Sequence, residues 1–270
     1  MDLQLNGKTA LVTGSSKGIG EAIAAALARE GAHVVVHGRD SVQADRVVAA
    51  IAALGGRAFA ALADLTRDED VERLVAEVEN RVGAVDILVN NAGGSGPKSD
   101  WQTTEPTQWT ASYDRNVLAA LRVTTGFLPK MRQARWGRVI NISSGAATIP
   151  PATGPDYSAA KAAMNAMTAS LAKAVAAEGI TVNAVSPGTI RSAKLEDAFR
   201  NVAADRGIAA RNAPWDEVQS GVLPLFAQVP LGRVGELAEL ADAVAFLVSP
   251  LAGYITGINL RVDGGFSPVL

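Results

Sequence analysis

Short runs of β-branched residues alternate along this chain with longer segments rich in alanine and leucine, and this alternation strongly limits its possible folds. Residues 34–36 (Val-Val-Val) and 87–89 (Ile-Leu-Val) are apolar without polar alternation, which is typical of strands buried on both faces. Strands that alternate with helices through short links form a parallel sheet. We therefore expect an α/β protein with helices on both faces of that sheet.

The elements can be bounded from the same pattern. Strands are expected at Thr9–Thr13, His33–His37, Asp86–Val89, Arg138–Ile142, Thr181–Val185 and Ile258–Val262, with a further strand before Asp64. Helices are expected at Ile19–Glu30, Ser41–Leu54, Arg67–Val82, Thr107–Met131, Tyr157–Ala177 and Glu236–Val248. Right-handed crossovers then give a Rossmann-type, doubly wound parallel sheet of about seven strands. No linker divides the chain, so residues 1–270 should form a single domain.

Two stretches interrupt this rhythm. Gly93–Glu105 is rich in Gly, Ser and Thr, and Ile190–Arg233 lacks a clear strand. Both should lie beyond the carboxyl ends of strands, where open α/β sheets bind ligands. We interpret residues 190–233 as the main substrate-loop region.

Charge and composition narrow the classes of partner. The 25 basic and 27 acidic residues are interspersed, with no basic block, so we expect a small-molecule substrate and no nucleic-acid partner. The chain has no cysteine, and no His/Asp/Glu cluster has metal-ligand spacing, so no metal site is expected. No secretory signal or membrane-spanning stretch is recognisable, so we expect a cytoplasmic protein.

The first strand is followed by a glycine-rich turn, Thr13-Gly14-Ser15-Ser16-Lys17-Gly18-Ile19-Gly20. Glycines allow a tight turn and close approach of backbone to a phosphate, and the next helix offers free N–H groups at its start. Such a turn can also be merely structural. Its place between the first strand and the first helix favours a dinucleotide site.

The tip of the second strand bears on the choice of cofactor. NAD sites usually carry an acid there, whereas this chain has Gly38 followed by Arg39, with Lys17 expected nearby. Two cations suit the 2′-phosphate of NADP(H). Asp40 leaves NAD(H) as the alternative, because its carboxylate could bind ribose hydroxyls if the strand ended later. Surface solvation is the other alternative for both cations.

Two further segments are candidates for the dinucleotide site. Asp64 and Leu65 follow the third strand and could bind and line the adenine pocket, or Asp64 could belong to the cap of the next helix. The segment Asn90-Asn91-Ala92-Gly93 follows the fourth strand. Its small residues would let a cofactor cross the sheet edge, and Asn90 could join adjacent loops by hydrogen bonds.

Tyr157 and Lys161 are four residues apart in an expected helix and therefore share one face. A nearby ammonium group favours phenolate and would lower the pKa of the phenol from about 10, making it a useful acid or base. Alone, such a pair is more often a surface Tyr and Lys. Ser144, at the end of the fifth strand, could bond a substrate oxygen, with Ser143 the lesser candidate. Asn116 could hold a water that links Lys161 to solvent, or mark a helix kink.

Taken together, these residues resemble the short-chain dehydrogenase/reductase family over essentially the whole chain, including Pro187-Gly188 and Asp263-Gly264-Gly265. The resemblance implies a catalytic tetrad of Asn116, Ser144, Tyr157 and Lys161. It implies that Lys161 also binds the nicotinamide ribose and that Ile190 and Ser192 hold the carboxamide, Thr being more frequent at the latter position. The cofactor-binding set is then Gly14, Ser16, Lys17, Gly18, Ile19, Gly20, Arg39, Asp64, Leu65, Asn91, Ala92, Gly93, Tyr157, Lys161, Pro187, Gly188, Ile190 and Ser192.

The resemblance implies an NADP(H)-dependent oxidoreductase that interconverts a carbonyl compound and an alcohol. The chain looks similar to the family's 3-oxoacyl-(acyl-carrier-protein) reductases, in which basic residues hold the acidic carrier. Arg135 matches one such position, but Glu178 stands where a second cation is expected. We therefore favour a small ketone, sugar, polyol or hydroxy acid as substrate. The alternatives are the acyl-carrier substrate, an NAD-dependent sugar or polyol dehydrogenase, and a non-catalytic NADP sensor. A homotetramer or homodimer is expected.

Overall fold

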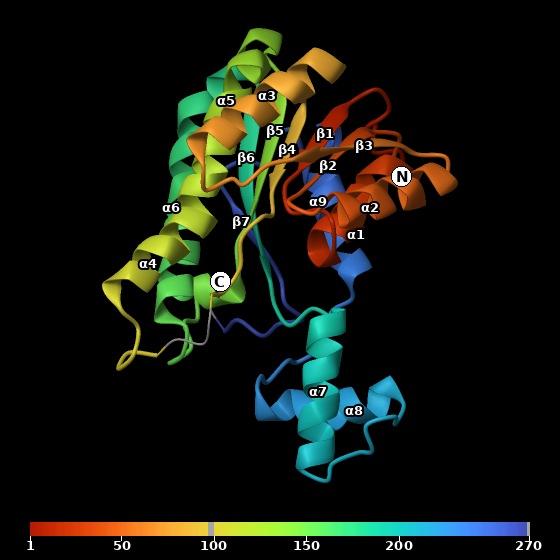
Figure 1. The fold of residues 1–270 in the computed structure, drawn as a ribbon, viewed down its shortest axis with the longest axis vertical. Coiled ribbons are helices and arrows are strands. Elements are labelled where there is room, and N and C mark those ends of the chain that lie inside the picture. The colour runs from red at the N-terminus through yellow and green to blue at the C-terminus, as the bar shows by residue number, and fades with distance from the viewer. Residues whose placement is uncertain (97–99, 269–270) are drawn as a thin grey trace.

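A computed structural model describes residues 1–96 and 100–268, and Figure 1 shows a parallel sheet with helices packed on its faces. All seven strands are parallel, in the order β3-β2-β1-β4-β5-β6-β7. The strands are β1 (Thr9–Val12), β2 (His33–Gly38), β3 (Arg57–Leu62), β4 (Ile87–Asn90), β5 (Gly137–Ile142), β6 (Ile180–Pro187) and β7 (Asn259–Val262). The expected Rossmann-type doubly wound sheet is confirmed.

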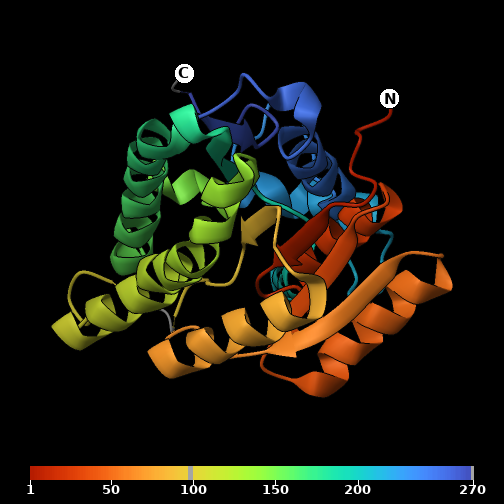
Figure 2. The same cartoon turned by 90° about the horizontal axis from the view of Figure 1, so that it is seen from above.

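Helices cover both faces of this sheet, as the view from above shows (Figure 2). The helices are α1 (Gly18–Arg29), α2 (Ser41–Ala53), α3 (Asp68–Val82), α4 (Pro106–Tyr113), α5 (Ala119–Ala134), α6 (Pro155–Val175), α7 (Ala193–Asp205), α8 (Trp215–Val222) and α9 (Leu237–Leu247). One apolar core lies between the sheet and α1, α2 and α9, and a second lies between the sheet and α3, α5 and α6. Among the described residues, no helix is long and apolar enough to cross a membrane.

The strand order reverses between β1 and β4, whose chains continue in opposite directions across the sheet. A crevice forms at such a switch point because the loops after the two strands diverge. The glycine-rich turn after β1 and the Asn90–Gly93 segment after β4 lie side by side there, and register pairs such as Val12 with Val89 bring them level. Topology therefore positions the expected dinucleotide site.

The strand before Asp64 is β3, Arg57–Leu62, and it lacks the β-branched run that marks the other strands. Its sequence, Arg-Ala-Phe-Ala-Ala-Leu, is alanine-rich, and it pairs with β2 alone at the edge of the sheet. Hydrogen bonding to β2 and packing of Phe59 and Ala61 into the core determine this strand. Intrinsic β-propensity contributes little to it.

The helix expected at Thr107–Met131 is interrupted. It divides into α4, a π-helical turn at Asp114–Leu118, and α5. Asn116 lies in the π turn and is fully buried. The kink considered for Asn116 is therefore present, and π turns of this kind occur often at functional sites.

The stretch expected to be a loop at residues 190–233 contains two helices, α7 and α8, which project from the end of the sheet (Figure 1). They share a small apolar core, separate from the two main ones, formed by Phe199, Ala203, Val218, Val222, Leu223 and Val234. No strand lies within this stretch, as expected. Of the other expected loop, Gly93–Glu105, residues 97–99 lie outside the described part of the chain.

Candidate active site

The turn after β1 has the shape of an anion cradle. Gly14 has a φ of +63°, a Cβ there would stand 3.0 Å from Ala92 Cα, and a Cβ at Gly20 would collide with the Gly14 carbonyl oxygen. Helix α1 begins at Gly18, and its N-cap residue Lys17 makes no side-chain capping bond. The N–H groups of the first turn therefore remain available to a phosphate, as helix geometry requires. A pyrophosphate fits this turn.

Thr13 and Asn91 hold the two loops of the crevice together. The Thr13 hydroxyl accepts hydrogen bonds from the backbone N–H groups of Asn91 and Ala92, both at 3.0 Å. In return, the Asn91 amide donates to the carbonyls of Thr13 and Gly14 at 2.8 and 3.0 Å. Asn90 is turned into the protein instead, where its amide donates to Thr124 and Asn141, so it joins β4 to α5 and β5. The joining role expected of Asn90 is thus shared with Asn91.

His37 contributes to the cradle in a way that the sequence did not indicate. Its Nδ1 accepts from the N–H of Gly14 at 3.0 Å, and its Nε2 lies 3.2 Å from the Ala63 carbonyl oxygen. Its backbone N–H and carbonyl both bond Ser15. Burial lowers the pKa of His37 to about 4, so the ring is neutral at pH 7. The ring therefore connects the ends of β1, β2 and β3.

The two expected cations follow β1 and β2, at the expected adenosine end of the crevice. Arg39 and Lys17 are both exposed, and Gly38 lies against Ser16, where a Cβ would stand 3.1 Å from the hydroxyl oxygen. Asp40 points elsewhere: its carboxylate accepts from the N–H of Gln43 at 3.2 Å and caps α2. The NAD alternative requires this carboxylate to bind ribose hydroxyls. Because it caps α2, it is less available for that role.

Asp64 and Leu65 form the turn between β3 and α3. The Asp64 carboxylate accepts from both the backbone N–H and the hydroxyl of Thr66, at 3.0 and 2.8 Å, and these bonds hold its pKa below the ordinary value. Leu65 is buried against the core. The N-cap of α3 is Arg67, so the Asp64 side chain closes the turn before the helix and does not cap it, and one carboxylate oxygen can still face a ligand.

Ser144 and Tyr157 form the centre of the candidate catalytic group. Ser144 follows β5 and caps a short 3₁₀ turn, and its hydroxyl is near enough to the Tyr157 phenol, at the start of α6, to lower the pKa of that phenol. Burial raises the pKa of Tyr157, and the Ser144 hydroxyl opposes that rise. The lowering expected from Lys161 is thus not seen in the chain alone, because desolvation is the larger effect.

Lys161 lies one helical turn after Tyr157 and is almost fully buried. Its Nζ is 5.9 Å from the centre of the Tyr157 ring and donates to the Ile142 carbonyl oxygen at 2.7 Å. Burial lowers the pKa of Lys161 to about 8. Ser143, the lesser serine candidate, points into the protein and donates to the Lys161 carbonyl oxygen. The helix therefore brings Tyr157 and Lys161 together with Ser144.

Asn116 joins the loop after β4 to the π turn by hydrogen bonds. Its Oδ1 accepts from the N–H of Gly94 at 2.8 Å, while its amide donates to the carbonyls of Gly94 and Ser112. Gly93 packs against it, and a Cβ there would stand 2.6 Å from Asn116 Oδ1. Both hydrogens of the Asn116 side-chain amide are donated to carbonyls. The water considered as a link to Lys161 would therefore have to donate to an oxygen of Asn116, either Oδ1 or the backbone carbonyl oxygen.

The expected nicotinamide end follows β6. Gly188 lies so close to Asp263 that a Cβ would stand 2.7 Å from the Asp263 Cα. Ile190 is buried, and Ser192 caps α7 by accepting from the N–H of Leu195 at 3.2 Å. The Ser192 hydroxyl proton is left free to donate to a carboxamide oxygen.

Arg135 lies at the opposite edge of the sheet from Ser144. It ends α5 two residues before β5, whereas Ser144 follows β5, and a six-residue strand spans about 20 Å. Its guanidinium donates to the Ala177 carbonyl at 2.8 Å, and Glu178 pairs with Arg132 at 2.8 Å. Within one copy of the chain, Arg135 cannot line the mouth of this site.

Comparison with known proteins agrees with this geometry. A family model described as short chain dehydrogenase matches residues 8–203. The 3-oxoacyl-(acyl-carrier-protein) reductases of Haemophilus influenzae and Vibrio cholerae are 37% and 38% identical to the chain. Each alignment covers 97% of this chain and 98% of the relative.

Solved structures extend the likeness to the projecting helices. L-sorbose reductase from Gluconobacter frateurii, complexed with NADPH and L-sorbose, superposes with a TM-score of 0.92 at 32% identity, over 100% of both chains. A 7α-hydroxysteroid dehydrogenase, complexed with NADH and 7-oxo glycochenodeoxycholic acid, gives 0.85 at 31% identity, over 100% of this chain and 98% of that chain. This chain belongs to the short-chain dehydrogenase/reductase family of oxidoreductases.

Proposed function

We propose that this chain is an NADPH-dependent reductase of small ketones, interconverting a carbonyl group and an alcohol. One observation carries the proposal: Ser144, Tyr157 and the buried Lys161 lie together at the carboxyl edge of the sheet, where the Ser144 hydroxyl acts on the pKa of the Tyr157 phenol and Lys161 Nζ is 5.9 Å from the centre of the Tyr157 ring. A hydroxyl, a phenol and an amine in one crevice can hold a carbonyl oxygen and deliver a proton to it.

The cofactor cradle fits a dinucleotide by its own geometry. Gly14, Gly18 and Gly20 leave room where side chains would fill the turn, and the start of α1 carries no side-chain cap. Arg39 and Lys17 would bind the 2′-phosphate, and Ile190 and Ser192 the carboxamide. When bound, NADPH supplies the hydride. The NADPH complex of the sorbose reductase supports this choice, although the steroid dehydrogenase is complexed with NADH.

The proton transfer is assigned to residues of the chain itself. Ser144 would donate a hydrogen bond to the substrate oxygen and draw electron density from the carbonyl carbon. Tyr157 would give its phenolic proton to that oxygen as the alcohol forms, which leaves a phenolate. Lys161 would stabilise the phenolate and help to return a proton from solvent. The positive charge of Lys161 would act against the desolvation that raises the pKa of Tyr157.

The substrate is best sought among small polyhydroxy ketones. The sorbose reductase aligns with the whole chain, so its match includes α7 and α8, which project beside the site. A 3-oxoacyl thioester on a carrier protein is the second candidate, favoured by the names of the curated relatives. The position of Arg135 argues against that candidate within a single copy of the chain.

The experiment is NADPH oxidation, followed at constant enzyme concentration against ketoses, simple ketones and an acetoacetyl thioester. We expect turnover with at least one ketose, and loss of turnover in Tyr157→Phe with NADPH binding retained. Turnover of the thioester alone would favour the second candidate. NADPH binding without turnover of any compound in the panel would instead favour a non-catalytic sensor.

A further inference from the structure

The two ends of the projecting segment, residues 191–234, meet at one point. Ile190 and Gly235 form an isolated parallel bridge, in which Arg191 donates its N–H to the Gly235 carbonyl at 2.8 Å. Gly235 donates in turn to the Thr189 carbonyl at 2.9 Å. These bonds join the two ends of the segment, which is also held by the Leu231 N–H donating to the Gly264 carbonyl at 3.2 Å and by the ion pair of Arg233 with Glu239 on α9 at 2.6 Å.

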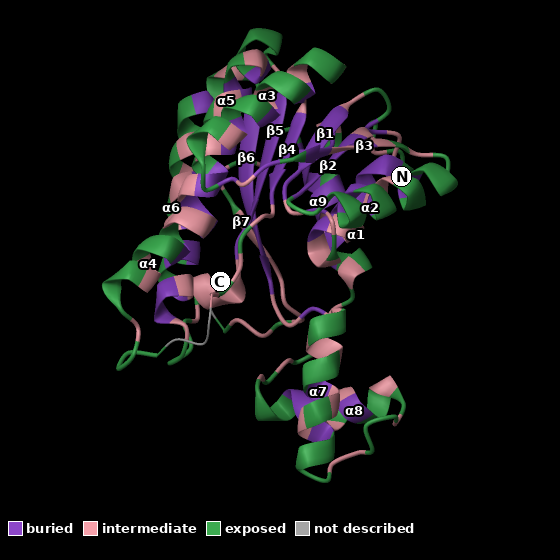
Figure 3. Ribbon diagram, viewed as in Figure 1, coloured by how far each residue is buried: buried purple, intermediate pink, exposed green. Residues whose placement is uncertain are grey.

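The projecting segment is held together from within. Phe199 on α7 packs against Trp215 on α8, with ring centres 5.9 Å apart, inside the small apolar core. Arg200 on α7 donates to the carbonyls of Arg211 and Ala213 in the connection between the two helices. Figures 1 and 3 show this unit standing apart from the sheet, with its own buried residues. The projecting segment therefore has an apolar core and hydrogen bonds of its own.

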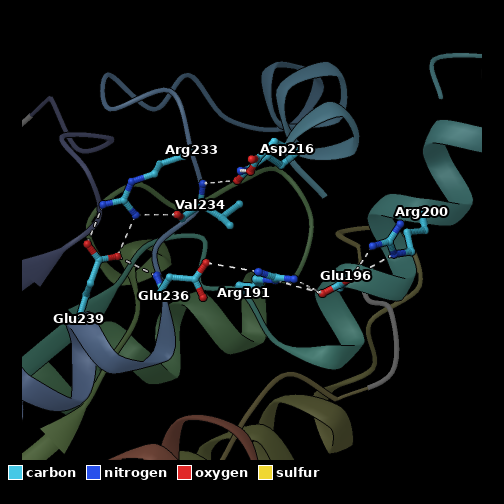
Figure 4. Close-up of polar contacts among 9 residues, drawn as sticks. Arg191, Glu196, Arg200, Asp216, Arg233, Val234, Glu236 and Glu239 are labelled. Atoms are coloured by element: carbon cyan, nitrogen blue, oxygen red, sulfur yellow. Dashed lines mark hydrogen bonds and ion pairs between the residues drawn. The ribbon is translucent and has the colours of Figure 1, made fainter. Parts of the chain in front are cut away.

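Arg191 connects this body to the rest of the protein (Figure 4). Its guanidinium bonds Glu196 on α7 at 3.0 Å and lies 4.8 Å from the centre of the Trp215 ring on α8. The same group lies 3.6 Å from the carboxylate of Glu236, which precedes α9. One side chain therefore contacts both helices of the projecting segment and the N-cap residue of α9.

Arg191 also adjoins the expected nicotinamide site in the sequence. Arg191 stands between Ile190 and Ser192, the residues that would hold the nicotinamide carboxamide. We propose that Arg191 is a positioning residue that couples nicotinamide binding to the placement of residues 191–234 over the substrate. This inference rests on the proposed NADPH site and adds to it a route from cofactor to substrate.

The physical basis is the planar fork of arginine, which can bond two carboxylates in different directions. A carboxamide held by Ile190 and Ser192 would restrict the turn, and the Arg191 fork would transmit that restriction to α7 and α8. Because the side chains of Arg191 and Glu236 are partly exposed, each ion pair is weak, and the coupling should be modest. We expect it to be about five-fold in affinity.

Ligand binding tests the coupling without turnover. NADPH and 2′,5′-ADP, which lacks the nicotinamide, are titrated by calorimetry into the unaltered chain, Arg191→Gln and Glu236→Gln. The matched control is Arg29→Gln, which breaks an exposed ion pair with Asp242 far from the nicotinamide end. We expect both test variants to bind NADPH about five-fold more weakly and 2′,5′-ADP unchanged, and the control to bind both normally.

Limited trypsin digestion tests how firmly the projecting segment is held. Arg206 and Arg211 are exposed in the connection between α7 and α8, so the rate of cleavage there reports the local opening of that connection. NADPH should slow this cleavage in the unaltered chain and in Arg29→Gln, but not in Arg191→Gln. The fragment 2′,5′-ADP should slow it in none of them.

The outcomes separate the two proposals. Normal NADPH affinity and normal protection of Arg191→Gln would overturn the role of Arg191 and leave the proposed function intact. Equal protection of the unaltered chain by NADPH and 2′,5′-ADP would also overturn it, because no nicotinamide contact would then be involved. Failure of the unaltered chain to bind NADPH would overturn both proposals.

Discussion

The imidazole Nδ1 of His37 accepts a hydrogen bond from the backbone N–H of Gly14 at 3.0 Å. The same ring reaches the Ala63 carbonyl through Nε2 at 3.2 Å, which identifies the neutral tautomer with its proton on Nε2. Protonation of Nδ1 would set two N–H groups against each other at the first glycine of the cofactor cradle. The shape of the cradle therefore depends on a histidine that stays neutral.

Protonation of His37 should make the folded protein less stable as the pH is lowered. The unfolded chain binds a proton at His37 near pH 6.5, whereas the folded chain does so only near pH 4. Between these values the unfolded state holds the extra proton, so the free energy of unfolding decreases as the pH is lowered, by up to about 3 kcal/mol.

Urea unfolding at pH 7 and pH 4.5 measures this loss, and His37→Gln is the comparison because its amide can bond both partners without titrating. We expect a clearly smaller loss in His37→Gln. Equal losses in the two proteins would mean that other groups account for the acid sensitivity.

Lys161→Met should abolish reduction and yet stabilise the fold at pH 7. The buried ammonium titrates near pH 8 instead of 10.5, so its desolvation costs about 3 kcal/mol at pH 7. The substitution also removes the hydrogen bond from Lys161 to the Ile142 carbonyl, and this loss destabilises the variant by about 1–2 kcal/mol. We expect a net gain of about 1 kcal/mol in urea unfolding, with Lys173→Met, an exposed lysine of α6, as the neutral control.

The gain from Lys161→Met should shrink as the pH rises from 8 toward 10.5. In that interval the folded chain releases the Lys161 proton before the unfolded chain does, so the unaltered protein regains stability. A gain that is constant over pH 7–10 would contradict the assignment of the cost to a buried charge.

Gly93→Ala should reduce activity much more than Gly94→Ala. Both glycines have positive φ, +145° and +130°, so backbone strain is common to the two variants. Only at position 93 does a Cβ meet Asn116, at 2.6 Å from Oδ1, whereas nothing lies within 4 Å at position 94. We expect kcat to fall about ten-fold further in Gly93→Ala, which corresponds to about 1.4 kcal/mol at the transition state. Steady-state kinetics, with circular dichroism to verify folding, would reveal equal losses if the contact with Asn116 is unimportant.

Arg39→Ala should weaken NADPH binding about ten-fold and leave NADH binding unchanged, because a charge-assisted bond to the 2′-phosphate is lost. Asp40→Asn, which can still cap α2 through its side-chain oxygen, should alter neither affinity. Fluorescence titration of both cofactors checks this. Weaker NADH binding in Asp40→Asn, with NADPH binding kept in Arg39→Ala, would support the NAD alternative.

Much of the fold could be predicted because the evidence was local. The entirely apolar composition of Val34–Val36 and Ile87–Val89 indicates that these strands are buried, and glycines mark the ends of helices. The expected site residues follow strands whose order is set by the crossover rule, so their meeting at one edge follows from topology. Helices α7 and α8 were missed, although Leu195, Phe199 and Val202 are spaced to share one helical face. That signal was weak beside the prolines that flank α8.

The sequence by itself determined the parallel sheet, its crossovers and the edge at which Ser144, Tyr157 and the glycine turn lie, because these depend on strand burial and chain connectivity. Only the tertiary structure decided the direction in which the pKa of Tyr157 moves, the capping role of Asp40 and the bonds of His37 to Gly14 and Ala63. Each of these depends on desolvation or on a hydrogen-bond partner distant in the chain, and neither can be read from the spacing of residues.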